Sequence, residues 1–439
     1  MRVQLVNPYP EEFFQSRIMD CYPPLGLLSI ATYLKSKSEG IDVEVLDAST
    51  DSQEEVESAV DADIVGISTT IGTYKNALRV AQIAKNAGAR VVLGGPYANA
   101  LATEILLNRE YVDCVVAGDG EEALFGYVMG EPLAEISNLV FRKNGRVARN
   151  PVRPLDIGRL PKVSFEYVDV TKYFANFRER FAFLGERLES SRELPVYSRK
   201  GCTWRMRGGC LFCSISDRAC RVKPPRMVWE EIEESVRRHG ANGIYDVSDD
   251  FLSDLPWLEE FAGMRRGDVY FVLMARSNLI TDLTADLLSK LDCARVFLGI
   301  ECGDQEMLDN MNKGTTVQDN VNAVRLLSGK GIKVTAGVVL GAPAENQESL
   351  ENTMRLLDRL IAFGNLDVID PNVLIPIPGS PSYGRLLSVP EMDEKYRGKD
   401  MFDATELQRD WVRHFCHIGF GDLLGAIDAL KSKVELSLY

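Results

Sequence analysis

The chain has 439 residues, of which 45% are hydrophobic and 26% are charged, a composition typical of a globular protein and not of a disordered or fibrous one. Its 50 basic and 64 acidic residues give a formal charge of −14, and no block of Lys or Arg offers the clustered positive charge that nucleic acids or anionic membranes bind. The length indicates two or three domains, each large enough for its own core.

The first residues, Met1–Pro10, predict a short strand and a turn and lack the apolar core of a signal peptide. No run approaches the ~18 apolar residues of a membrane span. We therefore expect a cytoplasmic protein with reduced thiols, in which cysteines serve metals or catalysis more often than disulfides.

Residues 1–130 alternate short apolar strands with helices, which predicts a doubly wound, Rossmann-like α/β domain with a parallel sheet. The expected strands are Arg2–Val6, Asp42–Leu46, Asp63–Ser68, Arg90–Leu93 and Val112–Ala117, and the expected helices are Leu25–Lys37 and Asn76–Asn86.

Small and polar residues follow these strands, where ligands of such folds bind. The four turns are Asn7-Pro8, Ser68-Thr69-Thr70, Gly94-Gly95-Pro96 and Gly118-Asp119-Gly120-Glu121. Such turns admit a large ligand close to the backbone, but they also occur for turn geometry alone, and the pattern leaves both readings open.

Residues 131–194 have weaker periodicity and predict a linker with a hairpin over Asn138–Val147. Strand and helix alternation resumes over 195–385 and predicts a partial (β/α)6 barrel with its active residues at the carboxyl ends of the strands. The expected strands are Val196–Ser198, Gly243–Val247, Val269–Met274, Arg295–Ile300, Lys333–Val339 and Asp367–Leu374. Residues 386–439 predict helices.

Four of the nine cysteines, Cys202, Cys210, Cys213 and Cys220, fall within one loop after the first barrel strand. The spacing suits either a closed tetrahedral zinc site with four thiolates or an iron-sulfur cluster with three, one iron then being open to a second ligand. The other five cysteines are scattered in apolar or mixed surroundings, which is typical of buried thiols.

This loop, YSRKGCTWRMRGGCLFCSISD, resembles the cluster loop of the radical S-adenosylmethionine (SAM) enzymes, whose usual motif is C-x3-C-x2-C with an aromatic residue before the last cysteine. Phe212 is that aromatic residue. Met206 stands where the family's second cysteine is expected, and the simplest alignment places a four-residue insertion, Met206–Gly209, before Cys210. The resemblance implies a [4Fe-4S] cluster held by Cys202, Cys210 and Cys213, with substitution by Cys220 left open.

Later segments are similar to the family's successive strands: YDVSDDF, MARSNLI, FLGIECGDQEMLDNMNKGTT, VTAGVVLGAPAEN and NVLIPIPGSPSY. The resemblance implies SAM contacts by residues at these strand ends: Phe212, Asp249, Asp250, Arg276, Ser277, Asn278, Glu301, Gly341 and Pro343. Five of these residues also have a plainer structural reading. Glu301 is otherwise a solvated charge at a strand end, the Asp249–Asp250 pair a helix cap, Arg276 a salt-bridge partner and Phe212 a core residue.

The first domain resembles the cobalamin (B12)-binding domain that precedes the radical domain in one large subgroup, through segments such as YPPLGLLSIATYL, VVLGGPYA and DCVVAGDGEEAL. The implied cobalamin contacts are Pro8, Leu25, Gly26, Ser68, Thr69, Thr70, Gly94, Gly95, Pro96, Tyr97, Gly118, Asp119, Gly120 and Glu121. None of the three histidines, His239, His414 and His417, lies in this domain. The resemblance therefore implies cobalamin without a histidine ligand.

The resemblance implies reductive cleavage of SAM to a 5'-deoxyadenosyl radical and, from the domain pairing, methylation of a carbon centre of a small-molecule or peptide substrate. A rearrangement, cyclisation or oxidation without methyl transfer is the alternative within the family, and a non-catalytic zinc protein is the alternative outside it. An electron donor such as flavodoxin or ferredoxin is implied, and neither nucleic acid nor membrane is expected as a partner.

Overall fold

The computed structural model describes residues 1–14, 20–181, 191–217 and 219–434. Two compact units form, one from residues 1–190 and 394–402 and the other from residues 191–393 and 403–439. The last five residues of the predicted C-terminal helical segment lie outside the described part.

The first unit is a seven-stranded sheet in the order β2-β1-β3-β4-β5-β6-β7. Its elements are β1 (Arg2–Asn7), α1 (Leu25–Lys37), β2 (Asp42–Asp47), α2 (Gln53–Ser58), β3 (Ile64–Ser68), α3 (Tyr74–Asn86), β4 (Arg90–Gly94), α4 (Pro96–Ala100), α5 (Ala102–Asn108), β5 (Cys114–Val116), α6 (Glu121–Val128), β6 (Leu139–Lys143), β7 (Arg146–Arg149) and α7 (Val170–Phe181), with 3-10 turns at Glu12–Phe14 and Ile157–Arg159. The first five strands pair in parallel, which confirms the doubly wound fold.

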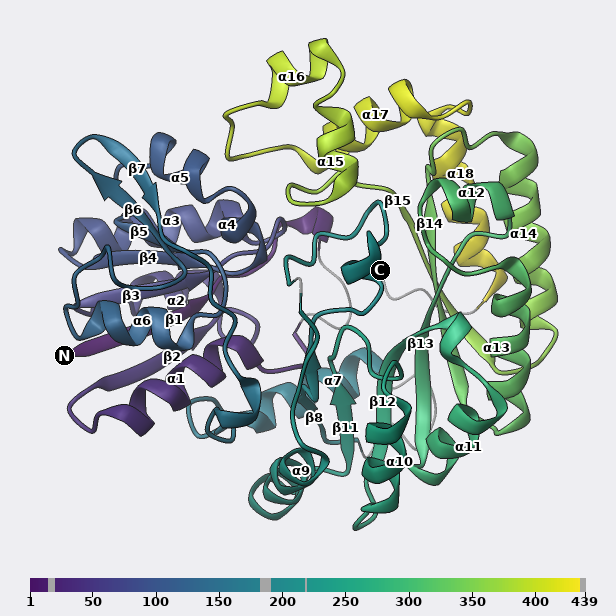
Figure 1. Ribbon diagram of the computed structural model, residues 1–439, viewed down its shortest axis with the longest axis horizontal. Coiled ribbons are helices and arrows are strands. Elements are labelled where there is room, and N and C mark those ends of the chain that lie inside the picture. The colour runs from purple at the N-terminus through teal and green to yellow at the C-terminus, as the bar shows by residue number, and fades with distance from the viewer. Residues whose placement is uncertain (15–19, 182–190, 218, 435–439) are drawn as a thin grey trace. The chain divides into compact units, whose positions relative to one another are not determined.

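Both faces of this sheet are covered by helices (Figure 1). Val65 and Ile67 of β3 belong to the core that α3, α4 and α5 close. On the other face, a methyl group added at Gly66 would meet Leu124 of α6. Alternate residues of β3 thus face opposite helix layers, which explains why the strand is apolar throughout.

The segment that the sequence suggested as a linker extends this sheet instead. β6 pairs antiparallel with β5, and β7 pairs with β6, so the predicted hairpin is present and prolongs the parallel sheet at its β5 edge. Pairing satisfies the backbone groups that an unpaired β5 would leave open, which a weak hydrophobic periodicity does not reveal.

Residues 394–402 return to the first unit and are held there by Asp400. Its carboxylate accepts hydrogen bonds from the Tyr74 hydroxyl (2.6 Å) and from Arg109 Nε (2.7 Å), and its side chain is 5% exposed. The Tyr97 hydroxyl donates to the Asp400 carbonyl oxygen. The buried Asp400 carboxylate, with its bidentate partner Arg109, thus holds residues 394–402 in the first unit.

Asp400→Ala should destabilise the first unit by about 3–5 kcal/mol, because it leaves the Arg109 guanidinium without its buried partner. Hydrogen exchange of peptides from α3 to α5 measures the change. Glu391→Ala is the control, since Glu391 is 62% exposed and 3.9 Å from Arg413 and should have almost no effect. Equal exchange in both variants would contradict the anchoring role of Asp400.

The second unit is a six-stranded parallel sheet in the order β15-β14-β13-β12-β11-β8, with helices along its outer side (Figure 1). Its elements are β8 (Glu193–Val196), β9 (Arg199–Lys200), β10 (Arg221–Val222), α9 (Pro225–His239), β11 (Gly243–Asp246), α10 (Leu255–Gly263), β12 (Tyr270–Arg276), α11 (Asp282–Lys290), β13 (Cys293–Glu301), α12 (Gln305–Asn310), α13 (Val317–Gly329), β14 (Lys333–Leu340), α14 (Gln347–Ile361), β15 (Leu366–Val373), α15 (Pro381–Leu386), α16 (Pro390–Tyr396), α17 (Ala404–Phe415) and α18 (Phe420–Lys433), with 3-10 turns at Arg205–Arg207 and Ser277–Leu279.

This sheet confirms the partial barrel, with one shift at its first strand. The sequence predicts Val196–Ser198, whereas β8 covers Glu193–Val196 and includes Pro195, which has no N–H to donate. β8 is an edge strand, where a proline costs no ladder hydrogen bond on its free side. The predicted C-terminal helices are present as α17 and α18.

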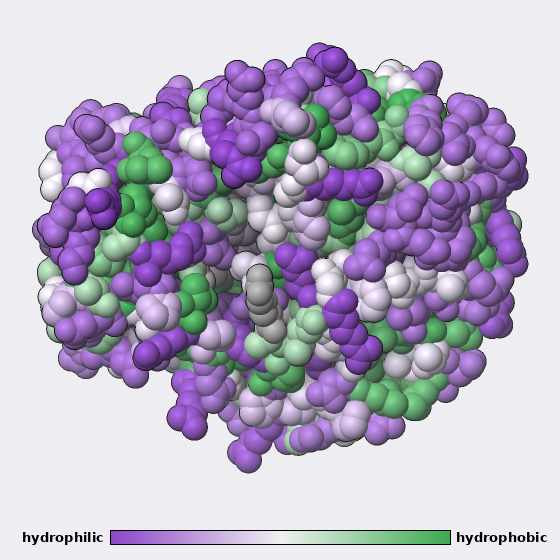
Figure 2. Space-filling model, turned by 45° about the horizontal axis from the view of Figure 1, so that its top comes forward, coloured by the Kyte–Doolittle hydropathy of each residue, from purple (hydrophilic) through white to green (hydrophobic). Residues whose placement is uncertain are grey.

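On the face of the molecule drawn in Figure 2, hydrophobic residues form small patches between hydrophilic ones. Among the described residues, no helix combines the length and the apolar character needed to cross a membrane.

Candidate functional site

The two faces of the second sheet differ in burial, and the difference identifies the face that carries the site. Leu273, Leu298 and Ala336 are completely buried and point to the outer helices. The register places Arg276 beside Gly299, Gly299 beside Gly337, and Gly337 beside Asp370. Paired residues in a parallel sheet share a face, so these four line the inner face.

The cysteine loop follows β8 at the carboxyl end of this sheet, as the sequence predicts. The predicted insertion Met206–Gly209 overlaps the 3-10 turn at Arg205–Arg207 and continues through Gly208 and Gly209, both with positive φ. Met206 is 56% exposed. The insertion therefore forms a surface turn that separates Cys202 from Cys210 without entering the core.

Electrostatic interactions connect the four loop thiols, because Cys202 acts on both Cys213 and Cys220. Burial raises the pKa of Cys213; the Cys210 and Cys202 thiols raise it further, while the Ile215 backbone N–H and the Arg205 guanidinium act against the rise. Burial also raises the pKa of Cys202, against which Arg276 acts. Cys202, Cys210 and Cys213 thus share one electrostatic neighbourhood.

Cys220 lies at the margin of this group. Its thiol donates to the Gly201 carbonyl oxygen (3.6 Å) and accepts from Arg199 Nη1 (4.0 Å). Within the described ranges, no three His, Cys, Asp or Glu side chains gather closely enough for a single metal ion. The arrangement therefore gives no support to a four-thiolate zinc site.

Asp249 and Asp250 hold the cysteine loop in place. Asp249 accepts from the Gly201 N–H (2.9 Å), and Asp250 accepts from both the N–H and the hydroxyl of Thr203. The N-cap of α10 is Asp254 instead, so the reading of the acidic pair as a helix cap is wrong. Their predicted contact with SAM stays a prediction, and one oxygen of Asp250 has no hydrogen-bond partner within the described part of the chain.

The three residues predicted at the end of β12 separate into different environments. Arg276 donates to the Lys313 carbonyl oxygen and has no ion-pair partner among the described residues. Ser277 is buried and donates to Asn320, and Asn278 is exposed. Only Arg276 of these three faces the cysteine loop.

Glu301 ends β13 in a conformation that only the surrounding structure can hold. Its φ is +61°, which a non-glycine residue rarely adopts, and it is 6% exposed, so the reading as a solvated strand-end charge is wrong. Its carboxylate pairs with Lys313 Nζ at 2.5 Å. A methyl group at Gly299 would lie 2.6 Å from that nitrogen, so only glycine leaves room for the pair.

Phe212 packs in the same hydrophobic cluster as Ala342, which lies in the turn predicted to bind adenine, and the SAM contacts of Phe212, Gly341 and Pro343 stay predictions. This hydrophobic cluster also includes Met311. The Pro343 carbonyl oxygen accepts from Asn310, and Gly341 adopts φ +89°. Sequence reasoning assigned no role to Glu345, which fixes this turn: its carboxylate accepts from the N–H groups of Gly341 and Ala342.

Glu345 gives the second unit a pH dependence. Burial raises the pKa of this carboxyl to about 7, although its two backbone hydrogen bonds act against the rise. Between about pH 4.5 and 7 the folded chain then binds more protons than the unfolded chain, so stability falls as pH rises, by about 2–3 kcal/mol. Burial raises the pKa of Asp370 to about 7 as well, and this carboxyl adds to the slope.

Glu345→Gln should reduce this pH dependence, because the amide resembles the protonated carboxyl and does not titrate. Urea unfolding followed by tryptophan fluorescence measures it, since all four tryptophans, Trp204, Trp229, Trp257 and Trp411, lie in the second unit. Glu348→Gln, an exposed residue three positions on, is the control and should keep the wild-type slope. An unchanged slope in Glu345→Gln would show that Glu345 does not titrate in this range.

The carboxyl edge of the first sheet is built from two kinds of predicted residue. Several hold the scaffold: Thr69 is buried and donates to the Gly94 carbonyl oxygen (2.7 Å), and Glu121 accepts from Ser29 (2.6 Å). Gly95 has φ +91°, and a methyl group there would collide with the Thr69 backbone. Pro8 and Tyr97 are also buried.

The remaining predicted residues are exposed or partly exposed, and two glycines among them adjoin open space. A methyl group added at Gly26 or Gly94 would meet no atom within 4 Å, and Gly26, Pro96 and Gly118 are exposed. The other predicted contacts, Leu25, Ser68, Thr70, Asp119 and Gly120, are partly exposed. Bare backbone over this edge fits a large flat ligand such as cobalamin.

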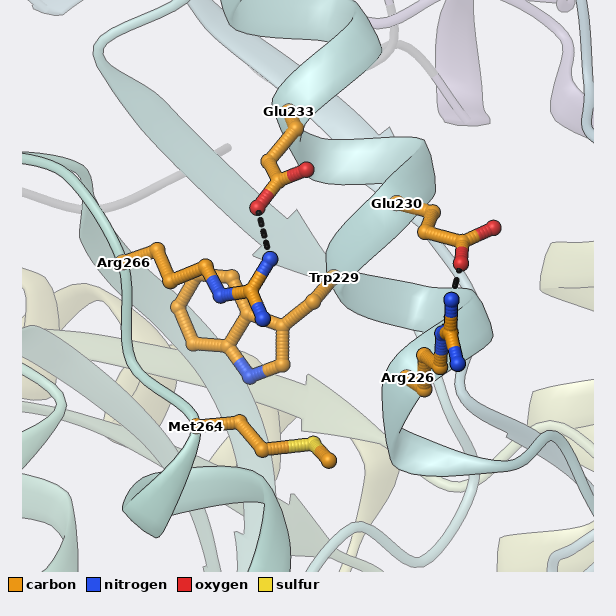
Figure 3. A pocket seen from close by; sticks show the side chains of 6 residues that line it. All are labelled: Arg226, Trp229, Glu230, Glu233, Met264 and Arg266. Carbon is orange, nitrogen blue, oxygen red and sulfur yellow. Dashed lines mark hydrogen bonds and ion pairs between the residues drawn. The ribbon is translucent and has the colours of Figure 1, made fainter.

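A surface hollow of about 500 Å³ lies elsewhere, between α9 and the end of α10 (Figure 3). Its charged side chains pair with one another, Arg226 with Glu230 and Arg266 with Glu233, and Trp229 forms its floor. None of the predicted site residues lines it, and it carries no catalytic assignment.

A doubly wound unit with an open carboxyl edge and a partial barrel with a four-cysteine loop define the class of protein, and comparison with known proteins identifies its family. The sequence model of the B12 binding domain matches residues 16–127, and that of the radical SAM superfamily matches residues 196–357. The chain belongs to the radical SAM enzymes that carry a B12-binding domain.

Curated relatives share about a quarter of their residues with the chain. An uncharacterized methyltransferase of Pyrococcus horikoshii is 26% identical over 87% of this chain and 82% of its own length. An anaerobic magnesium-protoporphyrin IX monomethyl ester cyclase of Rubrivivax gelatinosus is 26% identical over 81% of this chain, and the hopanoid C-2 methylase of Rhodopseudomonas palustris is 24% identical over 83%. The chain spans only 65% and 64% of the latter two.

Two solved structures share the fold. The radical SAM methyltransferase TsrM of Kitasatospora setae, with cobalamin and a [4Fe-4S] cluster bound, matches 88% of this chain and 75% of its own with a TM-score of 0.69 at 18% identity. The cobalamin-dependent SAM radical enzyme OxsB, with aqua-cobalamin and SAM bound, matches 99% of this chain and 61% of its own with a TM-score of 0.66 at 17% identity.

The residues of this chain fit the same groups. Three thiols near the Arg276 and Arg205 guanidinium groups suit a cluster, because a [4Fe-4S] centre with three thiolates carries net negative charge. Each thiolate binds a different iron, so the three need not converge on one point as for a single ion. The exposed glycines of the first unit leave room for a corrin ring, and no histidine is present there to bind cobalt.

Proposed function

We propose that this chain is a cobalamin-dependent radical SAM enzyme that methylates a carbon centre of a small-molecule or peptide substrate. The observation that carries the proposal is the presence, in one chain, of a B12-binding unit with an open carboxyl edge and a barrel whose cysteine loop includes Cys202, Cys210 and Cys213. The names of the Pyrococcus and Rhodopseudomonas relatives, a methyltransferase and a methylase, support methyl transfer.

When bound, the cluster supplies the electron that cleaves SAM, and cobalamin carries the methyl group. Cys202, Cys210 and Cys213 bind the cluster. Asp249 and Asp250 fix the loop that would hold the cluster, through Gly201 and Thr203.

Glu301 and Lys313 then order the SAM site, because the pair is already desolvated and aligned before substrate enters. Lys313 Nζ lies 5.9 Å from the Phe212 ring centroid, next to the turn at Gly341 that we assign to adenine. Farther along the inner face, Met274 and Phe297 share the register position of β12 and β13. These apolar side chains limit water near the reacting carbon.

Asp370 is the polar group that the sequence analysis missed on this face. It is 7% exposed, and its hydrogen bond from Asn372 is long at 3.4 Å. Burial raises the pKa of its carboxyl, Asn372 and Lys431 act against the rise, and Glu301 adds to it. A carboxyl in these surroundings suits contact with a hydrogen-bond donor of the substrate.

Cyclisation without methyl transfer is the second candidate, because the Rubrivivax relative is named a cyclase. The two candidates share cluster, cobalamin and SAM, and differ in the fate of the SAM methyl group. We also propose a cytoplasmic location, where thiols stay reduced, and a flavodoxin or ferredoxin as electron donor, because the cluster needs a low-potential reductant.

The test uses the full chain, reconstituted anaerobically with iron, sulfide and hydroxocobalamin, and then supplied with deuteromethyl-labelled SAM, a strong reductant and a desalted small-molecule and peptide extract of the source cells. Methyl transfer predicts 5'-deoxyadenosine and S-adenosylhomocysteine together, and a deuterated methyl group on one extract component. Deoxyadenosine alone would favour cyclisation or oxidation. If neither product forms, the radical assignment is contradicted.

A further inference from the structure

Arg276 lies within reach of a cluster ligand. Its Nη1 is 3.7 Å from Cys210 Sγ, a distance at which a guanidinium donates a hydrogen bond to sulfur. Arg276 therefore contacts one of the three proposed cluster ligands directly.

Three contacts hold the guanidinium in this position. Nη2 donates to the carbonyl oxygens of Lys313 and Gly314, and the guanidinium carbon lies 5.1 Å from the ring centroid of Trp204. Backbone carbonyls and an aromatic face leave the positive charge unneutralised, because neither is an anion. Among the described residues, Arg276 thus forms no ion pair with a carboxylate, and its positive charge acts on the nearby thiol.

Hydrogen bonds attach the segments on both sides of Cys210 to the loop that also holds this cation. Asn312 donates to the Gly209 carbonyl oxygen (2.6 Å), Leu211 N–H donates to the Met311 carbonyl oxygen (2.8 Å), and Trp204 Nε1 donates to the Asn312 carbonyl oxygen (2.8 Å). These bonds attach both ends of the insertion to the loop 311–314, whose carbonyl groups also bind Arg276. A methyl group at Gly314 would collide with the Trp204 ring, so the attachment is close-packed.

We propose that Arg276 is a positioning residue that binds the Cys210 thiolate of the cluster and raises the cluster's reduction potential. The inference rests on the proposed function. Hydrogen bonds to cluster sulfurs and nearby positive charge both stabilise the reduced, more negative cluster. Arg276 consequently acts on electron transfer and not on SAM directly.

The experiment compares midpoint potentials of the full chain, reconstituted with iron and sulfide and titrated without SAM while the reduced cluster is followed by EPR. Arg276→Lys keeps the charge, Arg276→Gln keeps a donor, and Arg276→Met removes both. We expect the potential to fall in all three and furthest in Arg276→Met. Arg295→Gln is the matched control, because Arg295 on the neighbouring strand pairs with Asp367 at 2.7 Å and should leave the potential unchanged.

A full iron complement in Arg276→Met with the wild-type potential would overturn the inference and leave the proposed function standing. A wild-type chain that binds no iron would overturn both. If every Arg276 variant loses the cluster, ¹⁵N-arginine labelling decides: in an Arg205→Lys background, which removes the guanidinium near Cys213, the reduced cluster should show a ¹⁵N coupling. Absence of that coupling would overturn the contact between Arg276 and the cluster.

Discussion

Alanine in place of Cys202, Cys210 or Cys213 should abolish SAM cleavage, lowering deoxyadenosine formation to the level of a sample without protein. A cluster that loses one of its three protein ligands is not retained in a state that passes an electron to SAM. Iron content per chain and deoxyadenosine formation are measured on each variant after identical anaerobic reconstitution.

Cys220→Ala is the matched control from the same loop. Its thiol lies against Arg199 and Gly201 and is not needed by a three-thiolate cluster, so iron content and cleavage should stay within about twofold of wild type. Loss of iron in Cys220→Ala, with retention in one of the other three variants, would show that Cys220 is a ligand and that the assignment of the set is wrong.

Lys313→Met should lower the stability of the second unit by about 3–5 kcal/mol, because it leaves the Glu301 carboxylate buried without its partner. Both side chains of the pair are less than 10% exposed. Adding Glu301→Gln to Lys313→Met should restore most of the loss, since the double variant has no uncompensated charge. Urea unfolding followed by tryptophan fluorescence measures all three proteins.

The double variant separates stability from function. Although its stability is restored, the double variant should bind SAM at least tenfold more weakly than wild type, because it lacks the aligned ion pair at the end of β13. Lys330→Met is the control, as Lys330 pairs with Asp286 on the surface, where both side chains are more than a third exposed, and it should change stability by less than about 1 kcal/mol. If the double variant binds SAM with wild-type affinity, Glu301 and Lys313 are not part of the SAM site.

Local periodicity predicted the elements well where a helix or strand is long and apolar. Leu25–Lys37 has the predicted bounds, and the five parallel strands of the first unit differ by one to three residues at their ends. The first barrel strand was predicted to begin after Pro195, because a proline usually interrupts a central strand. β8 is an edge strand, which tolerates the proline, and it therefore begins earlier in the chain. β6 pairs with β5 because β5 would otherwise be an unpaired edge strand. The local sequence pattern of β6 does not show this.

The sequence predicted only those site residues that directly follow the ends of strands. Glu301 and the cysteine loop lie where the barrel pattern places them, but the partners of these residues come from distant segments. Lys313 reaches Glu301 from the loop after α12, and Asp370 joins the same inner face from an edge strand. Arg276 was expected at a SAM carboxylate or in a salt bridge, and its contact with Cys210 depends on the loop 311–314, which binds both Arg276 and the segments beside Cys210.

The central claim, that one chain holds both groups, is tested most directly by cofactor stoichiometry and EPR on anaerobically reconstituted wild-type protein. The account predicts about four irons and one cobalamin per chain after desalting, and a cobalt(II) EPR spectrum without nitrogen splitting from an imidazole, since no histidine lies in the first unit. Zinc in place of iron, or cobalamin that passes through the desalting column unbound, would contradict it.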